Sequence, residues 1–560
     1  MKISILFPDQ KLEFKKLSET AVHDIGMDSV IKQLTKKEDE RVYIRNVMSM
    51  FTDDVDTAAY RSDVFDDIYR NKDMRKKIME LLDRVNFLKD YGSYKHDNDH
   101  EPSTWDLLHR LDEIRDYIEC IEKIYDCLDG SDIHSKGLLS LKDYVSSLYH
   151  DNGFDGLKED ISSLRATTDN LKSVTVGINL NERFEACGIG VISINNKPFT
   201  GSGVLSHFIE KVSGKDNIQS GTDWNGDYKY NEFTAQSPYI KSVPMAAAFS
   251  PMQLMTIRNI SEAEDQSRSI TNYMDNITDR LLSRTVKHLR NVLNKYATLT
   301  ITDITDLMPE FSYYIHWVEF IEKYTEKGFS FCKSEPEEGG ISMKAEGIYN
   351  LKLLEKSDIK DSDIVKNDLD FSDEHCLYIL TGANRGGKTT ITQAIGQAFF
   401  MAQGGVYVPG SRFTYTPADS IFTHFPADED KTLDLGRLGE ECKRFKEIYE
   451  NATGKSLILL NETFSTTSFE EGYYIARDCE KAILSKGIRC IYNTHMHKLA
   501  FEADELNEGS ECKKAVSLVV RTEEGGERSY KVEIAPPEGM SYANDIAEKY
   551  GVTYEMLTGQ

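Results

Sequence analysis

The sequence has few of the features that mark secreted, disulfide-bonded or membrane-spanning chains. Its nine cysteines are scattered over 560 residues without any C-x-x-C pair, which gives neither a disulfide framework nor a zinc site. It has no run of about 18 apolar residues that could cross a bilayer. In the opening stretch MKISILFPDQKLEF, Pro8 and Asp9 break the apolar run too early for a secretion signal. We therefore expect a soluble, cytoplasmic protein with no membrane partner.

Basic residues are outnumbered by acidic ones, 67 against 93. The formal net charge is −26, so the chain as a whole exerts no electrostatic attraction on DNA phosphates or anionic lipid. Any contact with nucleic acid must therefore be local, for example through a basic stripe. No fixed-period repeat or low-complexity tract is present. At roughly 100–200 residues per domain, the length predicts more than one domain.

The most informative stretch is residues 376–403, where the apolar run CLYIL leads into TGANRGGKTT and then TITQAIGQAFFMAQ. The pattern G-x-x-x-x-G-K-[ST] lies between a strand-like and a helix-like run, as a phosphate-binding loop requires. Glycines let successive backbone N–H groups point at a phosphate, and the helix adds its positive dipole end. We expect a nucleotide site made by Gly382, Ala383, Asn384, Arg385, Gly386, Gly387, Lys388, Thr389 and Thr390.

Two of these side chains have predicted roles of their own. Lys388 should reach the β and γ phosphates as a point charge. The Thr389 hydroxyl should be a ligand of Mg²⁺, which otherwise keeps mostly water and phosphate oxygens.

Two motifs further along the chain contain residues that could hydrolyse a bound nucleotide. In SLILLNETFSTTS, four aliphatic residues precede Asn461 and Glu462, and Glu462 can orient and partly deprotonate an attacking water. Asn461 stands where the first acidic residue is usual, so we expect it to contact the metal through a bound water and to add no negative charge. The run IRCIYNTH ends at His495, placed to sense the γ phosphate or the water. Glu462 and His495 are therefore the predicted catalytic residues.

The first half of the chain reads mainly as helix. Helical periodicity covers much of residues 40–172 and 253–324, with the longest candidate helix at 269–296, while 173–181 and 188–199 read as two paired strands. The segment SEPEEGG at 334–340 has linker composition and marks the predicted domain boundary.

Some features of this half have more than one interpretation. His96 and His100 lie four apart, but flexible polar loops collect histidines without a closed metal-ligand set. The aromatic residues between 224 and 239 could stack on bases, although a small hydrophobic cluster is the commoner explanation. The basic flank of 269–296 is more often a solvated face than a phosphate-binding one.

Together, TGANRGGKTT, VYVPG, LLNETFSTTS, NTHMHKL and SYANDIAEKYGV resemble the ATPase domain of the MutS family of DNA mismatch-repair proteins. The resemblance runs from about Gly347 to the end. Where the family places an aromatic residue against adenine, this chain has Ile364. More weakly, the helices and strand pair of the first 330 residues resemble the core, lever and clamp regions of the family.

The resemblance implies a multidomain fold with two parts. Residues 1–335 would form a mainly α-helical core, lever and clamp-like region with a small β element at about 173–254, and residues 341–560 would form an α/β P-loop ATPase domain of the ABC type. It also implies ATP and Mg²⁺ as cofactors, a homodimer formed through the ATPase domains, and a clamp on DNA, mismatched or branched, in DNA repair.

This sequence departs from the family pattern in places. The chain before the core is too short for mismatch-recognition and connector domains, so mismatch specificity does not carry over. The GRST-like signature appears as GRLGEE, with Leu438 where serine is expected. These departures keep open a nucleotide-gated interaction module with little turnover, acting on a protein or ribonucleoprotein. A metabolite kinase would share the loop but would not explain the later motifs.

Overall fold

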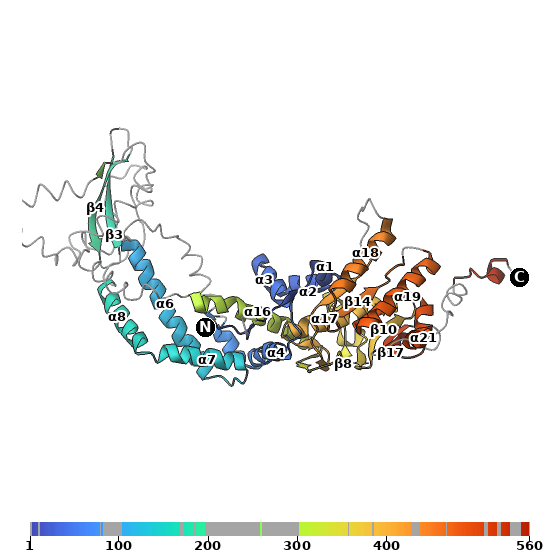
Figure 1. The fold of residues 1–560 in the computed structure, drawn as a ribbon. Coiled ribbons are helices and arrows are strands. Elements are labelled where there is room, and N and C mark those ends of the chain that lie inside the picture. The colour runs from blue at the N-terminus through green and yellow to red at the C-terminus, as the bar shows by residue number, and fades with distance from the viewer. Residues whose placement is uncertain are drawn as a thin grey trace, which may run out of the picture. The chain divides into compact units, whose positions relative to one another are not determined.

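The computed structural model describes residues 3–8, 12–78, 80–81, 104–168, 173–180, 182, 186–195, 258–259, 302–356, 358–383, 386–426, 436–465, 468–508, 513–522, 528–537 and 550–558. The chain divides into two compact units (Figure 1). The larger comprises Met1–Asp83, Asp126–Tyr144 and Thr302–Gln560, and the smaller comprises Arg84–Tyr125 and Val145–Ile301.

A six-stranded sheet forms the centre of the larger unit. Its order is β13 (Ile421–His424), β14 (Leu457–Asn461), β15 (Arg489–Asn493), β10 (His375–Thr381), β16 (Lys514–Thr522), β17 (Arg528–Ile534). All neighbouring pairs are parallel except the antiparallel pair β16–β17. The carboxyl ends of parallel strands are where α/β proteins bind ligands. The predicted motifs follow β10, β14 and β15, so the fold brings their residues to one edge of this sheet.

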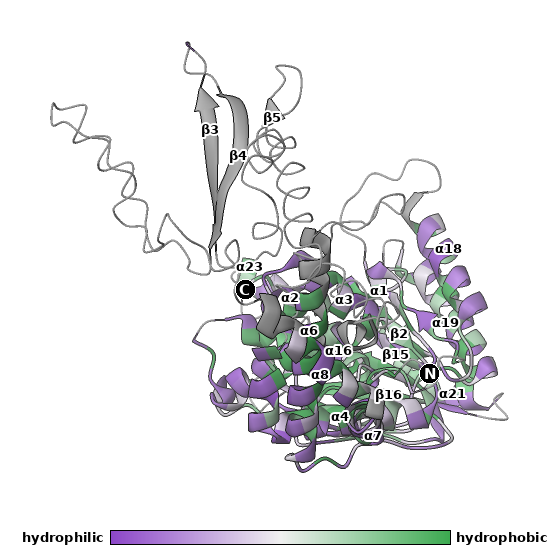
Figure 2. Cartoon of the chain, turned by 90° about the vertical axis from the view of Figure 1, so that its left-hand side faces the viewer, coloured by the Kyte–Doolittle hydropathy of each residue, from purple (hydrophilic) through white to green (hydrophobic). Residues whose placement is uncertain are grey.

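Helices cover this sheet. They are α17 (Lys388–Gln403), α18 (Gly436–Asn451), α19 (Phe469–Lys486), α20 (His497–Phe501) and α21 (Ala503–Asn507). Hydrophilic and hydrophobic residues alternate along α18 and α19, as expected for helices with one side against a sheet (Figure 2). In contrast α17 is buried over most of its length, because it contacts β14 and β15 as well as the N-terminal helices α3 and α4. The expected α/β domain is thus confirmed.

A second sheet changes the status of the predicted linker. Its order is β7 (Ser334–Pro336), β12 (Arg412–Tyr415), β8 (Met343–Ile348), β9 (Asn367–Phe371). Residues 334–336 are therefore a strand paired parallel with β12 rather than a linker, because composition reports local polarity and not backbone pairing. The compact units also do not follow the predicted boundary, since residues 1–83 share a unit with the ATPase motifs. The assignment of 1–335 and 341–560 to family domains stays a prediction.

The N-terminal helices of the larger unit are α1 (Glu19–Asp24), α2 (Met27–Leu34), α3 (Glu38–Met48) and α4 (Val55–Arg70), and α16 (Thr302–Thr325) packs on α2, α3 and α4. The helical periodicity expected over much of residues 40–172 is interrupted at Asn71, which caps the C-terminus of α4 with φ −92° and ψ 80°. Its side-chain amide donates to Asp67 O and Asp132 O, both at 2.9 Å. Short elements complete this unit: β1 (Lys15–Lys16), β2 (Met50–Phe51), β6 (Phe331–Cys332), β11 (Val408–Pro409), η1 (Leu351–Glu355), η2 (Asp361–Asp363) and α23 (Tyr554–Thr558).

The smaller unit confirms the predicted strand pair. Strands β3 (Ser173–Leu180) and β4 (Ala186–Asn195) are antiparallel, and β5 (Arg258–Asn259) adds to β4. Helix α8 (Asn152–Thr168) belongs to this unit, while α6 (Thr104–Asp129) and α7 (Lys136–Tyr149) each continue into the larger one. The candidate helix 269–296, the aromatic stretch 224–239, His96 and His100 lie outside the described residues.

Among the helices that the structure describes, none is long and apolar enough to cross a membrane. The described part of the chain also holds no group of three or more His, Cys, Asp or Glu side chains arranged to bind a metal. The cysteines whose side chains are described are free thiols: Cys120, Cys127, Cys332, Cys376, Cys442, Cys479 and Cys490.

One buried carboxyl group in α19 gives a stability prediction. Glu480 is fully buried, and neither of its carboxyl oxygens has a hydrogen-bond partner. Burial, with a smaller contribution from Glu502, raises its pKa well above 4.5. The folded protein therefore holds a proton that the unfolded chain releases, and stability falls as pH rises above about 4.5. We expect Glu480→Met to increase the free energy of unfolding at pH 8 by roughly 1–3 kcal/mol.

Urea denaturation of both proteins between pH 5 and pH 8 tests this. The gain from Glu480→Met should grow with pH, whereas Glu447→Met, at an exposed position of α18, should change stability little at any pH. A gain at Glu480 that is the same at both ends of the pH range would mean that the carboxyl does not titrate as described.

Candidate nucleotide site

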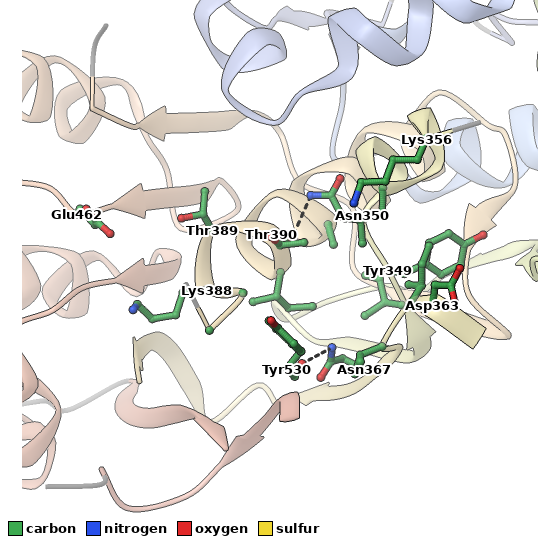
Figure 3. Close-up of a pocket in the computed structure, with 18 of the residues that line it drawn as sticks. Tyr349, Asn350, Lys356, Asp363, Asn367, Lys388, Thr389, Thr390, Glu462 and Tyr530 are labelled. Carbon is green, nitrogen blue, oxygen red and sulfur yellow. Dashed lines mark hydrogen bonds between the residues drawn. The ribbon is translucent and has the colours of Figure 1, made fainter. Parts of the chain in front are cut away.

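A pocket of about 740 Å³ lies at the carboxyl edge of the six-stranded sheet, a size typical of small-molecule sites. It is elongated (Figure 3): Glu462 and Lys388 lie at one end, Lys356 and Asp363 at the other, and Tyr530 between them. Of the predicted site residues, those that line it are Ile364, Gly386, Gly387, Lys388, Thr389, Thr390, Glu462 and His495. Segments distant in sequence thus converge here.

The loop between β10 and α17 depends on its glycines. Gly382 has φ +139°, and a Cβ atom there would lie 3.0 Å from the Val520 Cβ and 3.2 Å from its carbonyl oxygen. Gly387 caps α17 with φ +96°. Gly386 N donates to Ala383 O at 3.1 Å, which closes the turn. This backbone directs the N-terminus of α17 into the pocket. Asn384 and Arg385 lie outside the described residues.

Lys388 is 5 % exposed, and the hydrogen bonds of its ammonium go to neutral backbone carbonyls of the loop. Its ammonium donates to Gly382 O at 3.0 Å and to Ala383 O at 3.2 Å. Burial lowers its pKa, and the charge of Glu462 opposes that shift. A bound anion would stabilise the charged form of this lysine, which fits the predicted phosphate contact.

The Thr389 hydroxyl belongs to a small network of neutral oxygen and nitrogen atoms. It donates to Asn461 Oδ1 at 3.0 Å, and the side-chain amide of Asn493 donates to both of these residues. Asn461 and Asn493 are direct partners in the β14–β15 pairing, which brings them together. The buried Asn493 Oδ1 has no hydrogen-bond partner.

These atoms fit a hydrated Mg²⁺ ion. A hydroxyl and an amide oxygen are hard ligands of the kind that Mg²⁺ accepts, and the unpaired Asn493 Oδ1 can accept a hydrogen bond from a metal-bound water. Thr389, Asn461 and Asn493 contribute no carboxylate to this network.

Glu462 and His495 form a close pair. His495 Nε2 lies 2.7 Å from Glu462 Oε1, with the side chains 40 % and 34 % exposed. The hydrogen bond from His495 is the largest cause that lowers the pKa of Glu462, and the charge of Lys388 acts in the same direction. Glu462 adopts φ +53°, and its N–H donates to Asn493 O at 2.8 Å. The two predicted catalytic residues therefore lie together in the pocket, with the carboxyl held in its ionised form.

The other half of the pocket contains residues that sequence reasoning missed. Tyr530 has φ +55°, and its ring atom Cδ1 lies 3.3 Å from where a Cβ atom of Gly387 would be. Asn367 holds this backbone, since its amide donates to Tyr530 O at 3.2 Å and its Oδ1 accepts from Val532 N at 2.8 Å. The pocket thus has an aromatic wall that comes from β17, while Ile364 contributes an apolar one.

Leu438, at the position where the family signature has serine, is part of α18 and packs against the hydrophobic core beneath α19. It does not line the pocket. An apolar side chain therefore has a structural explanation at this position.

The sequence around this site is similar to that of known proteins. Residues 378–557 match the family model for MutS domain V. The DNA mismatch repair protein MutS of Chlorobium phaeovibrioides is 30% identical over 238 residues, which cover 40% of this chain and 26% of that protein. The DNA mismatch repair protein MutS of Fervidobacterium nodosum is 26% identical over 463 residues, which cover 76% of this chain and 54% of that protein.

A third relative carries a different name. Endonuclease MutS2 of Thermus thermophilus is 27% identical over 195 residues, which cover 35% of this chain and 25% of that protein. The chain thus spans between a quarter and about half of the length of these curated relatives. The matched residues include the loop before α17, Glu462 and His495, so residues 378–557 form a domain similar to MutS domain V.

Proposed function

We propose that this protein is a Mg²⁺-dependent ATPase of the MutS type, which dimerises through its ATPase domains and couples ATP binding and hydrolysis to the clamping of DNA. The observation that carries the proposal is the Glu462–His495 pair, 2.7 Å apart and in the same pocket as Lys388 and Thr389. This is the arrangement that hydrolysis of a bound nucleoside triphosphate needs.

The proposed binding mode follows the length of the pocket. Lys388 and the N-terminus of α17 would hold the β and γ phosphates. Mg²⁺ at Thr389, with Asn461 acting through a water, would supply positive charge that stabilises the transferred phosphoryl group. The base would lie toward Ile364 and Tyr530, which both line the pocket. Figure 3 shows Tyr530 between Lys388 and Asp363.

In the hydrolytic step Glu462 would orient the attacking water. Because His495 donates to Oε1, the other carboxyl oxygen can accept a hydrogen bond from water. The lowered pKa keeps Glu462 ionised at neutral pH, so its free oxygen can accept the proton of the water. The water oxygen would bond to the γ phosphorus as the bond from that phosphorus to the ADP oxygen breaks.

The contact between His495 and Glu462 predicts a change in the pH–rate profile. In His495→Leu we expect the loss of kcat on the acidic side to begin at a higher pH, because leucine has no donor to replace the hydrogen bond that lowers the pKa of Glu462. The measurement is kcat between pH 4.5 and pH 8.5. His497→Leu, which changes the histidine at the start of α20, outside the pocket lining, is the matched control. An acidic limb that does not move in His495→Leu would contradict the assigned interaction.

The proposal of dimerisation and clamping rests on the similarity of residues 378–557 to MutS domain V and of the chain to the MutS relatives. With a net charge of −26, a clamp on DNA must use local basic surface, and binding should weaken steeply with salt. ATP can open or close the proposed clamp only if it binds one arrangement of the clamp-like region more tightly than the other. Each tenfold difference in affinity shifts the equilibrium by roughly 1.4 kcal/mol.

A second function has a specific observation in its favour. Thr389, Asn461 and Asn493 bring no charged side chain to the proposed Mg²⁺ position, and Leu438 packs against the hydrophobic core rather than lining the pocket. Both features suit a nucleotide-gated interaction module with slow turnover, whose partner is a protein or a ribonucleoprotein. A protein that binds ATP tightly, hydrolyses it slowly and does not respond to any DNA would favour this alternative.

The test is the ATPase rate measured alone and with duplex, mismatched and branched DNA and with RNA, for the native protein and for Lys388→Ala. We expect hydrolysis that depends on Mg²⁺, changes with at least one DNA form, and is lost in Lys388→Ala. Hydrolysis without any response to DNA would refute the clamp, and hydrolysis retained in Lys388→Ala would refute the site.

A further inference from the structure

His424 joins helix α18 to the turn that carries Glu462. It ends β13, is 2 % exposed, and lies between α18 and the turn that follows β14. Its Nε2 is 3.2 Å from Glu441 O in α18, and its Nδ1 is 3.2 Å from Thr463 Oγ1, one residue beyond Glu462.

The hydrogen-bond partners of the His424 imidazole determine which ring nitrogen carries the hydrogen. A backbone carbonyl can only accept, so Nε2 must carry the hydrogen that is donated to Glu441 O. Nδ1 is then unprotonated and, at 3.2 Å, is the nearer acceptor for the Thr463 hydroxyl, whose other acceptor is His424 O at 3.4 Å. Burial, with the charge of Arg444, lowers the pKa of His424 to about 4, so this neutral form is the one present at neutral pH.

The turn that receives this bond has an unusual backbone. Glu462 and Phe464 both have positive φ, +53° and +64°, although neither is glycine. Such conformations cost about 1–3 kcal/mol each and persist when surrounding contacts hold them. From β15, Asn493 O accepts from Glu462 N at 2.8 Å and the Tyr492 hydroxyl donates to Thr463 O at 3.1 Å. The hydrogen bond to His424 adds a restraint from β13, which lies on the other side of β14 from β15.

On its other side, His424 is bonded to a helix with several contacts to the end of β13. In α18, Arg444 donates to Thr423 O and Phe425 O, both at 3.1 Å, and to Asp24 at 3.0 Å. This helix begins at Gly436 with the segment GRLGEE. A shift of α18 along its axis would therefore move Glu441 O and change the support of the Glu462 turn.

We infer that His424 and Thr463 are positioning residues for the proposed hydrolysis: they hold the Glu462 carboxylate in place and make its alignment depend on the position of α18. The inference rests on the proposed function. It predicts that loss of the Thr463–His424 bond lowers turnover without weakening the binding of ATP, because neither side chain lines the pocket.

The test compares Thr463→Val, which keeps the shape and removes the hydroxyl, with Thr463→Ser, which keeps the hydroxyl. We expect Thr463→Val to lower kcat roughly five- to tenfold, as for the loss of one hydrogen bond that aligns a catalytic group, with the dissociation constant for ATP changed less than about twofold. Thr463→Ser should restore most of kcat. His424→Phe should lower kcat similarly, and combining it with Thr463→Val should add little.

The matched control is Thr416→Val. Thr416 is equally a buried threonine, 7 % exposed, and its hydroxyl donates to Gly339 O at 2.8 Å, away from the pocket. Its kcat should stay within about twofold of the native value. An unchanged kcat in both Thr463→Val and His424→Phe would overturn the inference while native hydrolysis upholds the proposed function. Equal losses of kcat and ATP affinity would overturn it as well, since they indicate general damage. Absence of hydrolysis in the native protein would overturn both.

Discussion

Glutamine in place of Glu462 is expected to lower the rate of ATP hydrolysis by roughly 10²–10⁴-fold, the contribution typical of a positioned acid or base. The amide keeps the volume and can still contact His495, but it carries no negative charge to polarise a water. Lys388 and Thr389 are untouched, so ATP binding should persist or tighten. The measurement is kcat from single-turnover kinetics together with the dissociation constant for a fluorescent ATP analogue.

The matched control is Glu450→Gln, at an exposed position of α18, which should leave both quantities unchanged. If Glu462→Gln retained a tenth or more of the native rate, the water would have to be oriented by another group, and the role given to the Glu462–His495 pair would be wrong.

Arg61→Met is expected to lower the free energy of unfolding by about 3 kcal/mol or more, on the cost of losing charged hydrogen bonds to buried acceptors. Arg61 of α4 is fully buried and donates to Leu6 O and Gln403 O, both at 2.9 Å. Its guanidinium also lies 5.1 Å from the ring centroids of Phe7 and Phe14. Arg61 thus ties the N-terminal segment to the end of α17, and methionine would leave buried carbonyls unpaired.

Chemical denaturation followed by circular dichroism measures this effect. The control on the same helix is Arg70→Met, whose side chain is 70% exposed and pairs with Asp66 at 3.0 Å. An exposed pair of this kind contributes about 1 kcal/mol at most. Similar stability losses in the two variants would show that burial of Arg61 does not have the importance given to it.

The sequence predicted the parts of the site where a short motif has a fixed structural context. The apolar runs before Gly382, Asn461 and Glu462 are the strands β10 and β14, and the run before His495 is β15. Since parallel strands end at one edge, the order of the motifs was enough to predict that Lys388, Glu462 and His495 share a pocket. The roles given to these residues stay predictions.

Other parts of the site depend on contacts that no local pattern encodes. Tyr530 reaches the pocket because Asn367, from another sheet, holds its backbone at positive φ. Asn493 joins Asn461 through strand register, and a signal for it was present, since it lies two residues before His495 at the end of the same strand. The predicted linker at 334–340 contributes a strand because β12, about 80 residues later, is available to pair with it.

The most direct test of the whole account is a calorimetric titration of Mg²⁺–ATP into the native protein and into Lys388→Ala. The account predicts one site per chain in the native protein, binding that weakens without Mg²⁺, and a loss of affinity of at least about tenfold in Lys388→Ala, as expected when a charged contact to phosphate is removed. Binding of equal strength in both proteins, or no binding in the native one, would contradict it.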